Sequence, residues 1–168
     1  MAAQTRATVV AAVAAELEGP LIELCERVAA RAGVSAATVR KLFPRREALL
    51  AAGLDHLLEA ATPPKPAGST QSLVEAVFTY YDRLGPERLW AAYRHAEESE
   101  ALHQRVRRVE RAVEAALKPL GGGNRSTTAF IRMLLDPVAY RRQRASGVSA
   151  AAARANVTKA ISAVLGDN

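Results

Sequence analysis

Apolar residues recur along most of this chain with the three- and four-residue spacing of helices, and no segment alternates as a strand does. In the first segment, Val9, Val13 and Leu17 share one helix face before "EGP" interrupts the pattern. A later apolar stripe ends at "TPPKPAG", residues 62–68. This proline-rich segment is typical of a linker.

Capping residues and breakers divide the chain further. Gly33 stands where a left-handed residue would end a second helix, and Ser35 is a suitable N-cap for a third. Pro44 is expected to open a fourth helix. Beyond the linker we expect a capping box in "SLVE" at 72–75, a turn at Gly85, a stop at "GGG" at 121–123, a helix kinked by Pro137, and a last helix between Ser149 and Gly166. The pattern predicts about nine helices and an all-α fold.

Composition agrees with this fold class. The 168 residues are 49% hydrophobic but only 5% aromatic, and alanine and leucine dominate over β-branched residues. The single cysteine, Cys25, cannot form an intrachain disulfide, and no window is apolar enough to span a membrane. We therefore expect a cytoplasmic protein without a membrane partner.

The net charge of +6 is less informative than its distribution. Residues 1–60 carry seven basic and seven acidic side chains, so this part of the chain has no excess of either charge. Residues 27–46, however, contain six Lys or Arg and no Asp or Glu. A segment that excludes carboxylates is suited to contact with a polyanion such as DNA.

The same segment has the residue sizes that a helix-turn-helix requires. Ala29 is small where two helices would approach, Gly33 permits the turn, and Val39 fills the angle between the helices. The outward positions of the third helix would be Ala36, Ala37, Arg40 and Lys41, which could enter a major groove. The alternative is a three-helix packing motif whose arginines form a solvated face.

The stretch "VAARAGVSAATVRKLFPRREALL" resembles the helix-turn-helix and fourth helix of the tetracycline-repressor (TetR) family, with a close match over residues 24–50. A weaker match covers "FIRMLLDPVAYRRQRASGVS". The resemblance implies a DNA-binding domain at 1–45 and a ligand-binding and dimerisation domain at 46–168. It also implies a homodimer that pairs near 126–145 and 149–165, binds a palindromic operator in double-stranded DNA, and releases it when a small-molecule effector binds.

Family roles can be carried over to individual positions. Ser35 and Thr38 would contact phosphate, and Arg46 stands where the family often has a phosphate-binding lysine. The chain has Ala37 where the family usually has glycine and Arg40 where it usually has tyrosine. The expected DNA-binding residues are Ser35, Ala36, Ala37, Thr38, Arg40, Lys41, Arg45 and Arg46.

Candidate sites outside this segment are fewer. Large side chains that could line an effector cavity, or simply pack in the core, are Tyr81, Trp90, Tyr93 and Met133. A metal site is possible at His95, Ser99 and His103 only if one unbroken helix places these residues on the same face. The alternative is an ordinary polar helix face with charged pairs. No catalytic motif is present, and we expect neither an enzyme nor a cofactor.

Two functional hypotheses follow. The first is a TetR-like DNA-binding transcriptional regulator, a repressor released from its operator by an effector. The alternative is a TetR-like helical dimer that has lost ligand sensing or operator binding and acts as a protein-interaction module. A mobility-shift titration with DNA separates them, because only the first forms a saturable complex.

Overall fold

The computed structural model describes residues 2–20, 22–97, 99–120 and 125–166, which form helices and connections without a strand. The all-α fold is confirmed, and no described helix is both long and apolar enough to cross a membrane. Within these residues the helices are α1 (Ala2–Glu16), α2 (Leu24–Ala32), α3 (Ala36–Leu42), α4 (Arg46–Ala60), α5 (Thr70–Leu84), α6 (Pro86–Ala96), α7 (Glu100–Leu117), the 3-10 turn η1 (Lys118–Leu120), α8 (Arg125–Leu134), α9 (Pro137–Ala145) and α10 (Ala150–Leu165).

The helices group into two compact units. The first contains the described residues up to Ala61 together with Ala91–Arg107, and the second contains Thr62–Trp90 together with the described residues from Arg108 onward. The expected boundary after residue 45 differs from this division, because α4 packs against α1 and so belongs to the first unit.

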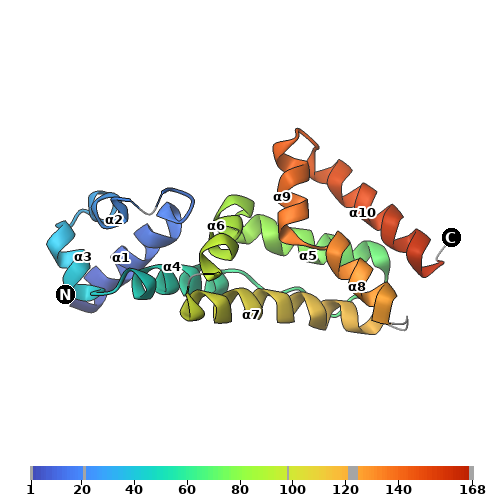
Figure 1. Ribbon diagram of the computed structural model, residues 1–168, viewed down its shortest axis with the longest axis horizontal. Coiled ribbons are helices and arrows are strands. Elements are labelled where there is room, and N and C mark those ends of the chain that lie inside the picture. The colour runs from blue at the N-terminus through green and yellow to red at the C-terminus, as the bar shows by residue number, and fades with distance from the viewer. Residues whose placement is uncertain (1, 21, 98, 121–124, 167–168) are drawn as a thin grey trace. The chain divides into compact units, whose positions relative to one another are not determined.

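In the first unit, α1 packs on both α4 and α2, and α2 packs on α3 (Figure 1). The approach of α1 to α4 is close at Gly53, where an added Cβ would lie 2.5 Å from Cγ1 of Val13 and 3.1 Å from the backbone nitrogen of Ala14. A residue without a side chain is therefore required here, although glycine is a poor helix former.

The predicted turn between α2 and α3 is confirmed. Gly33 ends α2 with a φ of 66°, and Ser35 caps α3 by accepting a hydrogen bond from the Thr38 amide at 3.1 Å. The fourth helix begins at Arg46, two residues after Pro44, with Arg45 extended at its N-cap. The linker at residues 62–68 contains no helix, as expected.

In the second unit, α10 packs along α5 and also contacts α8 and α9 (Figure 1). The Tyr81 hydroxyl donates to the Leu135 carbonyl at 2.8 Å, and the Tyr140 hydroxyl donates to Asp82 at 2.7 Å. The Tyr140 ring lies 4.2 Å from that of Phe78, centroid to centroid. Burial, together with the bond to Asp82, raises the pKa of Tyr140 to about 12. This hydroxyl therefore remains a donor throughout the physiological pH range.

Two predicted boundaries in this unit were wrong. The capping box uses Ser69 and Ser72 instead of "SLVE", because the Ser69 hydroxyl already accepts from the Ser72 amide and starts α5 at Thr70. The helix expected to be kinked at Pro137 is two helices, α8 and α9, since Asp136 accepts from two amides and caps a new helix. The caps at Ser149 and Gly166 are confirmed, and "GGG" lies outside the described residues.

Gly53→Ala should destabilise the protein even though alanine is the better helix former. The added methyl group would overlap Val13, and forcing the two helices apart should cost about 1–3 kcal/mol of unfolding free energy. Urea unfolding measures this loss. Gly68→Ala is the control, since a Cβ there meets no heavy atom within 4 Å. If Gly53→Ala were the more stable protein, the close approach of α1 and α4 would be wrong.

Candidate nucleic-acid interface

The third helix presents a distinct outer face. Val39 is fully buried, whereas Ala37, Arg40 and Lys41 are exposed. Ala36 and Thr38 are half-buried at the margin of this face. Of the four outward positions expected from helical spacing, Ala37, Arg40 and Lys41 therefore lie on one exposed surface, with Ala36 only at its margin. The small side chain of Ala37 lets the helix backbone approach a surface closely.

The two hydroxyl groups expected to contact phosphate lie together at the start of α3. The hydroxyl oxygens of Ser35 and Thr38 are 2.9 Å apart, so one of them donates to the other. Because each hydroxyl has one hydrogen, the second hydrogen remains for an external acceptor such as a phosphate oxygen.

Glu16, at the end of α1, neutralises two of the six cations. Its carboxylate accepts from Nε of Arg27 at 3.0 Å and from Nε of Arg31 at 2.7 Å. Arg27 also donates to the backbone carbonyls of Pro20 and Ile22, at 2.6 and 2.7 Å. Arg27 and Arg31 hold both ends of α2, and the turn before it, to α1, so their role is structural.

A third cation is neutralised within the helix pair itself. Arg40 of α3 forms an ion pair with Glu26 of α2, and both side chains remain accessible, at 59% and 48%. The pair bridges the two helices on the outer surface. Arg40 is therefore at the expected place but has a carboxylate partner.

Three cations of the segment are left. Among the residues that the structure describes, Lys41, Arg45 and Arg46 have no carboxylate within ion-pair distance. All three are exposed. Counting basic residues in the sequence thus overstated the number of unpaired cations twofold, because the neutralising glutamates Glu16 and Glu26 come from outside residues 27–46.

The beginning of α4 can bind an anion. Arg45 occupies the N-cap without a side-chain cap hydrogen bond, and Arg46 and Glu47 lie in the first turn. Free amide groups at a helix N-terminus attract anions, while cations there oppose the helix dipole. A phosphate would satisfy both the amides and the two arginines.

Arg6 is a residue of this region that sequence reasoning missed. Its guanidinium stacks over the Phe43 ring at 4.4 Å and donates to the Leu42 carbonyl at 3.4 Å. It therefore supports the end of α3 from α1. The role of Arg6 depends on contact between helices that are distant in the sequence, so no local sequence pattern could have identified it.

The four residues expected to line an effector cavity are not brought together in one unit. Tyr93 falls in the first unit, and the other three fall in the second. Tyr81 is buried and hydrogen-bonded, whereas Met133 is 58% exposed. The face of Trp90 is covered by the Arg141 guanidinium at 5.3 Å, which Glu87 holds by a 2.7 Å hydrogen bond. Their common role in a cavity remains a prediction.

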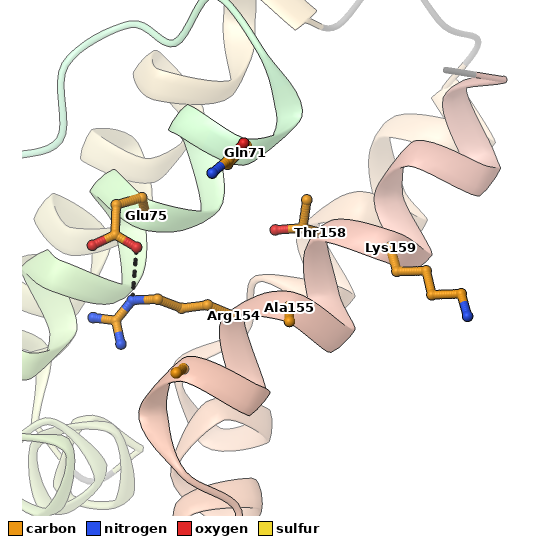
Figure 2. Close-up of a pocket in the computed structure, with 7 residues that line it drawn as sticks. Gln71, Glu75, Arg154, Ala155, Thr158 and Lys159 are labelled. Carbon is orange, nitrogen blue, oxygen red and sulfur yellow. Dashed lines mark ion pairs between the residues drawn. The ribbon is translucent and has the colours of Figure 1, made fainter. Parts of the chain in front are cut away.

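A groove of about 520 Å³ runs between α5 and α10 (Figure 2). Figure 2 shows Arg154 pointing across it toward Glu75, with Nε 3.0 Å from the carboxylate. That Nε lacks hydrogen-bond geometry, although another nitrogen of Arg154 donates to Asp82 at 2.7 Å. The groove is therefore a helix seam whose arginine already has two carboxylate partners.

The histidines do not share the helix face that a metal site would need. The chain leaves α6 after Ala96 and enters α7 at Glu100, so His95 and His103 lie on separate helices. Within the described part of the chain, no three His, Cys, Asp or Glu residues are placed to hold a metal ion.

Glu16→Gln should destabilise the protein in a pH-dependent manner. Hydrogen bonding by Arg31 is the largest cause that holds the pKa of Glu16 below its ordinary 4.5. A lowered pKa means that the stabilisation is complete above the unfolded value and is lost as the pH falls through the folded value. We expect a loss of about 1 kcal/mol at pH 7 that fades below about pH 4.5. Urea unfolding against pH tests this, with the exposed Glu59→Gln as control; a pH-independent difference would contradict it.

No family model, curated protein or solved structure matches this chain. The resemblance to TetR-family regulators therefore rests on the motif residues alone.

Proposed function

We propose that this chain is a TetR-like, DNA-binding transcriptional regulator that places α3 in the major groove of a palindromic operator. The observation that carries the proposal is the exposed surface formed by Ala37, Lys41, Arg45 and Arg46 beside a capped helix-turn-helix, whose three cations have no carboxylate partner among the described residues. Such a surface is unfavourable in isolation, because Arg45 and Arg46 lie at the N-terminus of α4, where cations oppose the helix dipole. Phosphate groups would offset that repulsion.

The parts of this surface are suited to different contacts. Lys41 lies on the outer face of α3 and is suited to base edges, whereas Arg45 and Arg46 precede and begin α4 and are suited to the backbone. The spare hydroxyl hydrogen of Ser35 or Thr38 adds a neutral phosphate contact. One short helix reads only a few base pairs, so specific binding calls for two copies.

An exposed apolar pair on α8 supports a homodimer. Phe130 and Met133 are 43% and 58% exposed and lie one helical turn apart, while Ile131 on the opposite face is buried. Val164 of α10 is a third exposed apolar residue, and α10 contacts α8. A second copy of the chain would cover these side chains and bring two recognition helices onto one duplex.

An effector would act through a coupling that is reciprocal. A ligand that weakens DNA binding must itself bind more weakly when DNA is present. If an aromatic effector stacks on Trp90, it must first displace the Arg141 guanidinium from the ring. An anionic group on the effector would suit that arginine.

The alternative is a helical dimer that has lost operator binding or ligand sensing and serves as an interaction module. The neutralisation of Arg27, Arg31 and Arg40 favours it, since half of the cations in the segment are unavailable. Titration of duplex DNA from either side of its own gene separates the two functions. The regulator forms a saturable, sequence-dependent complex at about 0.1 M salt, whereas the interaction module forms none.

Lys41→Ala and Arg46→Ala should weaken DNA binding in different ways. Loss of a phosphate contact at Arg46 should weaken all sequences alike and reduce the slope of log affinity against log salt by about 0.9 per protomer. Loss of Lys41 should narrow the difference between operator and unrelated DNA. Mobility shifts over a range of salt concentrations measure both effects, and identical behaviour of the two variants would contradict the assigned roles.

Met133→Glu should convert the dimer to a monomer. A charge in the apolar contact would be buried without a partner on association, which is strongly unfavourable. Light scattering at micromolar concentration reports the mass. Ile22→Glu is the matched control, because Ile22 is 78% exposed but lies in the first unit. A wild type that is monomeric yet binds DNA fully would overturn the dimer.

A further inference from the structure

The ion pair between Glu26 and Arg40 has no evident need in the fold. Both side chains are about half exposed, and exposed pairs contribute only about 0–1 kcal/mol to stability. The helices α2 and α3 are already held by the buried Val28, Ala29 and Val39 and by the turn at Gly33. The pair therefore acts mainly on the outer surface, where it decides what Arg40 can bind.

A carboxylate and a phosphate compete for the same guanidinium. Glu26 lies on α2 and Arg40 on α3, so the carboxylate sits at the edge of the face proposed to meet DNA. If Arg40 moved to a phosphate, Glu26 would be left unpaired beside a polyanion. Both the lost pair and the new repulsion oppose that step.

Building on the proposed DNA-binding function, we infer that Glu26 withholds Arg40 from the phosphate backbone and thereby limits the sequence-independent affinity of the protein for DNA. Non-specific binding depends almost wholly on cations at phosphates, so it loses one contact per protomer. Operator binding also draws on contacts of α3 with base edges, which Glu26 does not affect. Affinity for operator and for unrelated DNA therefore falls by the same factor, while the base-edge contacts that distinguish the two are kept.

Glu26→Gln tests this inference, because glutamine keeps the size and hydrogen bonding of the side chain and removes only its charge. With Arg40 free to reach phosphate, the salt slope on an unrelated duplex should steepen by about 0.9 per protomer. At 0.1 M salt this corresponds to about eight-fold tighter binding per protomer. Binding to the operator should tighten by a similar factor, since a phosphate contact does not depend on sequence.

Glu23→Gln is the matched control. Glu23 is exposed at the N-cap of the same helix, its side chain makes no cap hydrogen bond, and it is not paired with Arg40. The Glu23→Gln substitution removes the same charge but leaves Arg40 paired with Glu26. The slope of log affinity against log salt for this variant should therefore equal that of the wild type. Thermal melting of each variant verifies that it is folded.

Arg40→Gln completes the cycle. In the wild-type background it should change the slope on unrelated DNA little, while in the Glu26→Gln background it should remove the added 0.9. Equal slopes for Glu26→Gln and Glu23→Gln, or a steeper slope that survives Arg40→Gln, would overturn the inference alone. If neither the wild type nor Glu26→Gln binds duplex DNA at low salt, the proposed function fails as well.

Discussion

Some cations of residues 27–46 pair with the protein's own glutamates, and the others are exposed to solvent. The rest of the structure around α3 depends on this division. Glu16 forms ion pairs with Arg27 and Arg31 and so holds α2 against α1. Glu26 forms an ion pair with Arg40. The remaining cations form a smaller basic surface at the end of α3 and the start of α4. Within this one segment, some of the cations hold the helix-turn-helix together and the others form its exposed basic surface.

If the protein binds DNA as proposed, this division separates affinity from selectivity. Each arginine that a carboxylate neutralises reduces the sequence-independent attraction to phosphate, while contacts to base edges are unaffected. The rigid support of α3 works in the same direction, because Arg6 and Phe43 hold one end of the helix and Ser35 caps the other. In the proposed DNA complex, a helix held at both ends would distinguish sequences by fit instead of adapting to each of them.

Local patterns predicted the fold well, because an N-cap or a left-handed glycine acts within one helical turn. Gly33, Ser35, Ser149 and Gly166 were found for this reason. The start of α5 was misplaced since Ser69 and Ser72 are both capable caps, and only the backbone shows which is used. The partners of the cations could not be predicted, because Glu26 and Arg40 are joined by the packing of α2 on α3, 14 residues apart in the chain. For the same reason the sequence suggested six free cations where the structure leaves half that number.

An NMR titration tests the central claim most directly. Isotope-labelled protein would be titrated at about 0.1 M salt with a duplex of about 20 base pairs from beside its own gene, long enough for two half-sites. The amide signals of residues 35–46 should shift first and furthest, with those at the end of α2 following. Largest shifts in α5 and α10, or no saturable shift at all, would contradict the assignment of α3 and the start of α4 as the DNA-binding surface.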